Sequence, residues 1–325
     1  MWPGPIKAPV TQSILNKFVQ CPYRAYLYLI LGLEPDLPPN LNLVWGDIAH
    51  NGIEHRINGS QEACREAVLA KYQEWAPQVD DHRYEAFPLS ILTMLGMFDF
   101  SIYENGQAEV EFDRIHKING IPFRTAGKID VLLPDAIGEH KCKGRIYPEQ
   151  LKHEIVQDLQ CNYYMFPLEI EWVHYDLIRI PDTQEYGLPR KLVGQTQKEF
   201  IAELYTHPKH RSPWNDFPIK YNQPSWIHQD KYFLPLEEQE FYWKTCIEPL
   251  MLRLYEWYDY VTSPEFDYQN PDCYNHIFYR MPVRQFIASN TEKFECDYYH
   301  FLLGLEDIDS LRPVPSYYAE LNEQN

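Results

Sequence analysis

The sequence GKIDVLL at residues 127–133, followed by GEHK at residues 138–141, decides the expected fold. Both stretches suit short strands of a β-hairpin, the first carrying Asp130 and the second carrying Glu139 and Lys141. Because side chains alternate between the two faces of a strand, Glu139 and Lys141 share one face. If Asp130 projects to the same side, two carboxylates meet, and their repulsion favours a divalent cation between them. The stretch therefore predicts a metal site with its own lysine, which suits phosphodiester cleavage.

The charge of the chain is unevenly distributed. The 325 residues carry a formal net charge of −18, which argues against nucleic-acid affinity spread over the whole surface. Residues 114–152 nevertheless contain eight Lys or Arg against four Asp or Glu. A basic segment around an acidic cluster is what a phosphate-backbone substrate requires, although the same count also fits solvated strand ends. The charge pattern is consistent with the metal-site hypothesis but does not establish it.

The composition places the chain among globular proteins of a reducing compartment. With 25 tyrosines and ordinary apolar content, the sequence does not predict disorder. It has no apolar run long enough for a membrane helix and no secretory signal pattern at residues 1–5. Seven cysteines without a CxxC pair make a disulfide framework improbable. We expect a cytoplasmic protein of a bacterial or phage-infected cell.

The periodicity of the sequence predicts a mixed α/β core between helical regions. Helical spacing is found at residues 11–31, from about 45 onward, and at 61–75, 84–103, 148–166 and 236–260. Strand patterns are found at residues 108–112, 123–133, 137–142 and 171–180. The order of three strands, a helix and a strand predicts a mixed sheet. We expect a helical region at 1–106, a core at 107–185 and a helical or irregular extension at 186–325, integrated as one domain.

Several motifs in order resemble the PD-(D/E)XK nuclease superfamily, specifically its RecB-like exonuclease branch. The opening helix at residues 13–24 resembles the pattern S-x-L-x-x-(aromatic)-x-x-C-P, and residues 45–50 resemble G-x-x-x-H. The two central motifs follow, Gly127-x-x-Asp130 and Glu139-x-Lys141, and after them a helix motif formed by Gln160 and Tyr164. The sequences at residues 175–179 and 232–233 resemble those of phage-type members. The residues that carry the later motifs are His50, Asp130, Glu139, Lys141, Gln160 and Tyr164. Each of these is unremarkable singly, and it is their order along the chain that makes the resemblance specific.

The resemblance implies a restriction-endonuclease-like α/β fold and a role for each motif residue. His50, Asp130, Glu139 and the backbone carbonyl of His140 would hold Mg²⁺ or Mn²⁺, since oxygen ligands suit hard cations and an imidazole favours Mn²⁺. The resemblance gives Lys141 the task of polarising the attacking water and stabilising the transition state. It implies DNA contacts from one further group of residues, which are Gln160, Tyr164, Lys143 and Arg145. Glu111 is a weaker candidate for an outer-shell or second-metal carboxylate.

The chain departs from the family at an iron–sulfur element that many RecB-like members carry. Cys21 and Cys273 match two of its four thiolate positions, but no cysteine occupies residues 274–289, and Cys296 is the only later one. Because a cubane cluster needs four thiolates, we expect the cluster to have been lost. An unusual ligand set of Cys21, Cys273, Cys296 and one other residue stays open as the alternative.

Two kinds of protein are compatible with these motif residues, and a third, a structural or protein-interaction protein, rests only on the aromatic-rich region at residues 181–266. The first is a metal-dependent DNA exonuclease in phage or bacterial DNA processing, recombination or replication, acting on linear single- or double-stranded DNA. The second is a catalytically inactive DNA-binding or assembly module that kept the fold. The intact residues Asp130, Glu139 and Lys141 favour the enzyme. A homo-oligomer or a replication or recombination partner is compatible with either kind, and the sequence does not specify one.

Overall fold

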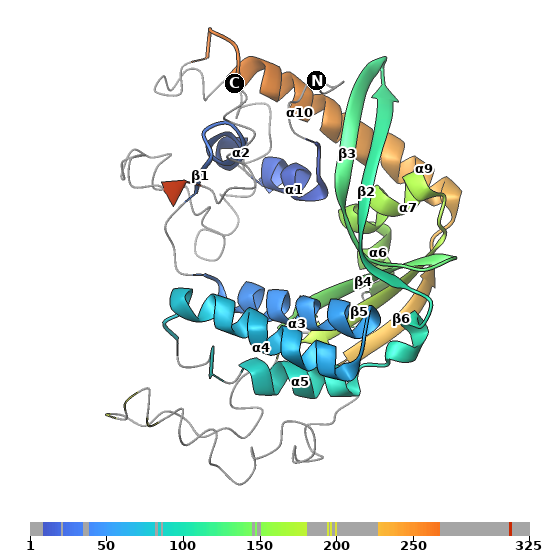
Figure 1. Cartoon of the computed structure of the whole chain (residues 1–325). Coiled ribbons are helices and arrows are strands. Elements are labelled where there is room, and N and C mark those ends of the chain that lie inside the picture. The colour runs from blue at the N-terminus through green and yellow to red at the C-terminus, as the bar shows by residue number, and fades with distance from the viewer. Residues whose placement is uncertain are drawn as a thin grey trace. The chain divides into compact units, whose positions relative to one another are not determined.

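In the computed structural model (Figure 1) the chain forms two compact units, and each unit is built from segments that are not contiguous in sequence. One unit comprises residues 1–37, 112–127 and 240–325, and the other comprises residues 38–111 and 128–239. We call the second the sheet unit. The structure describes residues 9–20, 22–34, 39–81, 84–85, 87–144, 147, 151–180, 194, 196, 199, 227–266 and 312–313. The sequence-based division into three regions stays a prediction.

A five-stranded sheet in the order β2-β3-β4-β5-β6 is the framework of the fold. Its strands are β2 (Gln107–Ile118), β3 (Ile121–Leu132), β4 (Ala136–Lys143), β5 (Trp172–Arg179) and β6 (Ile227–Phe233). The β2–β3 hairpin turns at Asn119 and Gly120, both with positive φ (49° and 81°), as a two-residue type I′ turn requires. The pairs β3–β4 and β5–β6 are antiparallel, whereas β4 and β5 are parallel. The predicted mixed sheet is confirmed, with β6 as a strand that the sequence patterns did not reveal.

Two short helices form the connection between the parallel strands β4 and β5. They are α6 (Leu151–Val156) and α7 (Leu159–Leu168), where the sequence predicted one helix over residues 148–166. The break lies at Asp158, whose side chain accepts hydrogen bonds from the backbone N–H groups of Gln160 and Cys161 at 2.7 and 3.0 Å. Aspartate favours the cap over a helix interior because its side chain competes for backbone donors. This cap fixes where α7 begins, and with it the position of Gln160.

Three helices pack together in the sheet unit and share a core with its strands (Figure 1). They are α3 (Leu41–Ile57), α4 (Gln61–Trp75) and α5 (Phe87–Met97), followed by a 3-10 turn at Phe100–Tyr103. Helix α4 has the predicted bounds, with Ser60 as its cap, whereas α3 starts earlier than predicted, at the Asn40 cap. At Gly52 an added Cβ would lie 2.6 Å from Val68 and 2.8 Å from Leu95, so only glycine permits this approach of α3 to its neighbours.

The other unit joins chain segments from both ends of the described sequence. The predicted helix over residues 11–31 is two helices, α1 (Gln12–Gln20) and α2 (Pro22–Leu29), and the Thr11 hydroxyl caps the first. The predicted long helix over residues 236–260 consists of α9 (Leu236–Tyr242), a π-helical turn (Trp243–Ile247) and α10 (Glu248–Val261). Phe18 packs against Trp257 with ring centroids 5.2 Å apart, so α1 contacts α10. The two-residue strands β1 (Leu33–Glu34) and β7 (Arg312–Pro313) pair antiparallel.

Candidate metal and nuclease site

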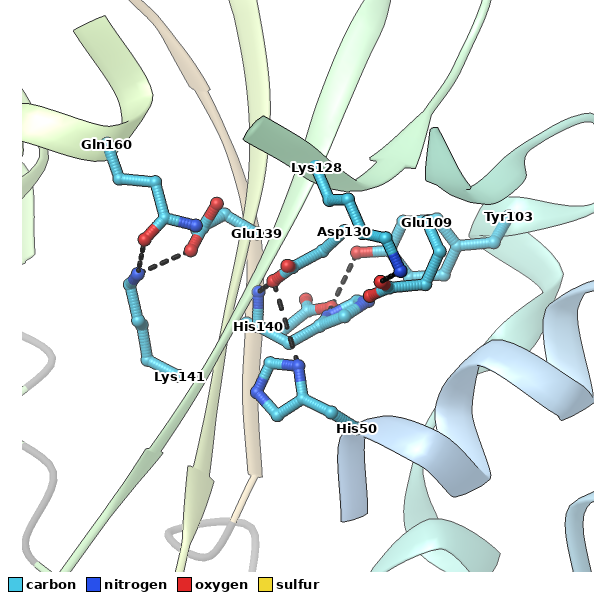
Figure 2. Close-up of polar contacts among 10 residues, drawn as sticks. His50, Tyr103, Glu109, Lys128, Asp130, Glu139, His140, Lys141 and Gln160 are labelled. Atoms are coloured by element: carbon cyan, nitrogen blue, oxygen red, sulfur yellow. Dashed lines mark hydrogen bonds and ion pairs between the residues drawn. The ribbon is translucent and has the colours of Figure 1, made fainter. Parts of the chain in front are cut away.

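Strands β3 and β4 bring Asp130 and Glu139 together. Val131 pairs with Gly138, so Asp130 and Glu139 each lie next to the last paired residue of their strand, and the charge of Asp130 raises the pKa of Glu139. The backbone N–H of His140 donates a hydrogen bond to Asp130 Oδ2 at 2.9 Å (Figure 2). The hairpin expected from the sequence therefore places both carboxylates at one end of the β3–β4 ladder.

Lys141 lies against Glu139 on the same face of β4, as the alternation of the strand predicts. Its ammonium group donates to Glu139 Oε1 and, at 2.8 Å, to Gln160 Oε1 on helix α7 (Figure 2). Burial lowers the pKa of Lys141, but the charges of Glu139 and Asp158 outweigh this effect and raise the pKa above its ordinary value. Lys141 is therefore a fixed cation at neutral pH.

Glu139 is a buried carboxylate, and one of its two oxygens has no hydrogen-bond partner among the described residues. The side chain is 1% exposed, and this oxygen is Oε2. Burial raises the pKa of Glu139 well above its ordinary range, Asp130 raises it further, and Lys141 opposes both. An unpartnered carboxylate oxygen in the interior is costly, and a cation would relieve the cost.

His50 reaches the same carboxylate pair from helix α3. Its Nδ1 atom lies 3.9 Å from Asp130 Oδ2, and its side chain is 31% exposed. Desolvation lowers the pKa of His50, with the charge of Asp130 opposing and those of His140 and Lys141 reinforcing the effect. A neutral imidazole with an available lone pair is the form that binds metals.

The imidazole of His140 lies on the opposite face of β4 from Glu139. It is 2% exposed, and its Nδ1 atom lies 2.9 Å from Asp176 Oδ2 on strand β5. The Tyr103 hydroxyl donates a hydrogen bond to the same oxygen. Sequence reasoning missed Asp176 and Tyr103, because the contact joins residues 36 and 73 positions apart in the chain.

Glu109 on β2, which the sequence did not single out, interacts electrostatically with Asp130. Glu109 has a positive φ of 56°, which interrupts the alternation of β2, and its side chain pairs with Lys128 at 3.2 Å. Burial raises the pKa of Glu109, and Lys128 opposes this while Asp130 and Glu54 add to it. Glu111 is exposed. A left-handed backbone at a glutamate leaves no sequence signal, and the proposed role of Glu111 stays a prediction.

The residues predicted to contact DNA have different surroundings. Gln160 faces the Lys141 ammonium, and Lys143 pairs with Glu154 at 2.6 Å. Tyr164 is buried, with 4% of its surface exposed, and its ring packs edge-on against Tyr163. Arg145 lies outside the described residues, as do the three cysteines considered for an iron–sulfur cluster, Cys21, Cys273 and Cys296. Their predicted roles stay predictions.

The donor set fits a divalent cation chemically, although the side chains do not converge on one point. Within the described part of the chain, no three His, Cys, Asp or Glu residues are grouped closely enough to hold a metal ion. The unpartnered Glu139 Oε2, the neighbouring Asp130 and the neutral imidazole of His50 nevertheless supply two hard oxygen donors and one nitrogen donor. In this arrangement Glu139 Oε1 contacts the Lys141 ammonium and Asp130 Oδ2 accepts from the His140 N–H, so the side chains must move before all the donors can bind one ion.

Comparison with known proteins assigns the class. The family model of the PD-(D/E)XK nuclease superfamily matches residues 9–185, and the chain belongs to this superfamily. The mixed five-stranded sheet flanked by helices is consistent with the restriction-endonuclease-like fold of that superfamily. Nucleases of this superfamily act on DNA and generally use divalent metals such as Mg²⁺.

Solved and curated proteins add little to the family assignment. A solved structure titled "Crystal structure of SSO0001" is 15% identical, with 64% of this chain and 79% of that chain covered and a TM-score of 0.29. A likeness of this size carries no argument about the site. No curated protein is significantly similar to the chain. Among the described residues, no helix is long and apolar enough to cross a membrane.

Proposed function

We propose that the protein is a divalent-metal-dependent DNA exonuclease of the RecB-like, phage-type branch. It would hydrolyse linear DNA during processing, recombination or replication in a phage or bacterium. The observation that carries the proposal is the buried Glu139 carboxylate, with one oxygen unpartnered, near Asp130 and in contact with Lys141. Two neighbouring carboxylates and a lysine are the groups that metal-assisted phosphodiester hydrolysis needs.

His50, Asp130 and Glu139 are the proposed ligands of Mg²⁺ or Mn²⁺, with the backbone carbonyl of His140 as a further donor. Bound there, the cation would supply a polarised water and would offset negative charge on the scissile phosphate. The raised pKa of Glu139 means that the cation competes with a proton for this carboxylate, whereas the lowered pKa of His50 keeps its imidazole neutral.

Lys141 is the proposed electrostatic catalyst. Its ammonium is held by Glu139 and by Gln160, so it has two anchors on different elements. When Glu139 turns toward a cation, Gln160 keeps the ammonium beside the carboxylates, where it would stabilise charge on a phosphate. Because α7 begins at the Asp158 cap, the position of Gln160 is fixed by the helix terminus.

The exonuclease proposal is tested with substrates that differ only in having ends. Purified protein is incubated with Mg²⁺ or Mn²⁺ and end-labelled linear single- or double-stranded DNA, beside a covalently closed circle. We expect hydrolysis of linear DNA and none of the circle. Lys141→Ala should lose the activity, while Lys152→Ala, which removes an exposed lysine of α6, should keep it.

The result separates the two hypotheses drawn from the sequence. If neither linear nor circular DNA is cut and Lys141→Ala binds DNA like the parent, the protein is a DNA-binding module without activity. Cutting of the circle would instead indicate an endonuclease. We also expect the anaerobically purified protein to contain no iron, and stoichiometric iron would contradict the proposed loss of the cluster.

A further inference from the structure

Beneath the proposed metal site lies a buried chain of polar side chains from three elements. It consists of Tyr103 in the 3-10 turn, Asp176 on β5 and His140 on β4. Asp176 is 0% exposed and Tyr103 1% exposed, within an otherwise apolar core. We call these three residues the buried polar triad.

The hydrogen bonds of the triad define the proton on His140. Asp176 Oδ2 accepts from the Tyr103 hydroxyl and contacts His140 Nδ1 at 2.9 Å. A carboxylate only accepts hydrogen bonds, so the contact with Asp176 places a proton on Nδ1 of His140. Burial, followed by the charge of Asp176, raises the pKa of Tyr103, so the hydroxyl keeps its proton and remains a donor.

Burying these polar groups lowers the stability of the fold, so packing alone does not explain why they are there. A buried carboxylate requires compensation, and among the described residues Asp176 Oδ1 and His140 Nε2 have no hydrogen-bond partner. Apolar side chains of similar volume would avoid both costs. Aromatic rings already surround the imidazole, with Phe98 at 5.7 Å, Tyr103 at 5.4 Å and His50 at 6.0 Å between ring centroids.

The triad is connected to the proposed metal site through the backbone of β4, because His140 is bonded to both Glu139 and Lys141. The backbone N–H of His140 holds the Asp130 carboxylate at 2.9 Å, and its neighbours in β4 are Glu139 and Lys141 (Figure 2). A rotation or shift of residue 140 would therefore move the hydrogen bond to Asp130 and the backbone that carries the other two groups. The imidazole is fixed to β5 by Asp176, which itself is fixed by Tyr103.

We propose that Asp176 is a positioning residue that orients the proposed metal ligands Asp130 and Glu139 through His140. Asp176 contacts the imidazole of His140 and would act on the metal ligands only through this residue. It holds the ring of His140 in one tautomer and one orientation, and the Tyr103 hydroxyl holds Asp176. The inference rests on the proposed metal-dependent function.

The principal test is Asp176→Leu with Mn²⁺ binding as the readout, measured by the electron paramagnetic resonance of free Mn²⁺. Leucine has a similar size but no acceptor atom, so the His140 imidazole loses the partner of its Nδ1 atom. We expect Mn²⁺ affinity to fall roughly tenfold to a hundredfold, the range typical of lost partners behind metal ligands. The ¹⁵N spectrum of labelled histidine should show the loss of this hydrogen bond in the same sample.

Ser90→Ala is the matched control for a lost buried hydrogen bond. Ser90 on α5 accepts from Trp45 Nε1 at 2.8 Å in the same unit, away from the triad. We expect this variant to lose thermal stability without losing Mn²⁺ affinity. Equal losses of Mn²⁺ affinity in both variants, or parental affinity in a folded Asp176→Leu, would overturn the inference.

Tyr103→Phe keeps the inference testable if Asp176→Leu does not fold. It removes one donor to Asp176 and leaves the ring packing and the contact with His140, so we expect a few-fold weaker binding of Mn²⁺. Parental affinity in this variant would then contradict the positioning role. Asp130→Asn separates the two proposals: if it binds Mn²⁺ like the parent, the metal site itself is wrong. If it abolishes binding while the triad variants do not, only the positioning inference fails.

Discussion

The two faces of strand β4 differ in how completely their polar groups are paired. On one face Glu139 and Lys141 form a charged cluster with Gln160, and one carboxylate oxygen is left without a partner. On the other face the His140 side chain lies among aromatic rings, with its Nδ1 held by Asp176. The difference shows that one strand can present the proposed catalytic groups on one face and a structural hydrogen bond on the other, because consecutive side chains point in opposite directions.

The largest effect is expected where a lysine of the charged face is removed. Lys141→Met should lower the rate of DNA hydrolysis about 10²–10³-fold, the usual loss for one fixed electrostatic group in an active site. Lys143→Met, two residues along, should cost only a few-fold, because Lys143 pairs with a partly exposed Glu154. Single-turnover hydrolysis of labelled linear DNA measures both rates. Equal losses of hydrolysis rate in the two variants would show that Lys141 has no special role in catalysis.

The anchoring face is tested by adding one methyl group. In Gly138→Ala the new Cβ would lie 2.8 Å from Tyr103 Cε1 and 3.0 Å from Val131 Cβ. We expect the free energy of unfolding to fall by about 1–3 kcal/mol, the typical cost of overpacking. Denaturant unfolding measures the change. Gly144→Ala, with no atom within 4 Å of the added Cβ, is the control and should unfold like the parent.

The raised pKa of Glu139 predicts a pH dependence of metal binding. Because the pKa is higher in the folded protein, the fold favours the protonated carboxyl, and without metal the protein loses stability as pH rises through that value. Mn²⁺ competes with the proton, so the Mn²⁺-induced rise in Tm should grow with pH above the ordinary glutamate value of about 4.3. One competing proton contributes at most about 1.4 kcal/mol per pH unit. In Glu139→Gln most of this dependence should disappear.

The smallest effect is expected from the second anchor of the lysine. Gln160→Ala removes the 2.8 Å contact with Lys141 but leaves the Asp158 cap of α7, which uses the backbone of residue 160. We expect a few-fold lower kcat with unchanged Mn²⁺ affinity, because Glu139 still holds the ammonium in the free protein. A loss as large as that of Lys141→Met would mean that Gln160 contacts the substrate directly.

Local patterns predicted the fold best where a residue's neighbours in sequence are also its neighbours in space. Helix α4 has the predicted bounds because Ser60 caps it and no breaker interrupts it before residue 75. Strand β6 was missed because its sequence HQDKYF is too polar to read as a strand, and it is held by pairing with β5. The single helix expected over residues 148–166 is divided because Asp158 caps α7. Competing local interactions of this kind are difficult to weigh from sequence.

The candidate site likewise combines contacts that the sequence predicted with contacts that it did not. The alternation of β4 placed Glu139 and Lys141 on one face, and the structure has them in contact. The proximity of His50 to Asp130, expected from the order of the motifs, is present at 3.9 Å. Glu109, which the sequence did not single out, interacts electrostatically with Asp130, and the role predicted for Glu111 stays a prediction.

The sequence by itself determined the hairpin, its pair of carboxylates and its lysine, because strand alternation is a property of consecutive residues. It also determined the superfamily, through motifs whose order does not depend on geometry. Only the tertiary structure decided that Glu139 is buried with an unpartnered oxygen, and that Tyr103 and Asp176 meet His140. Burial and pairing between distant segments depend on how the sheet and helices pack, and no local pattern encodes them.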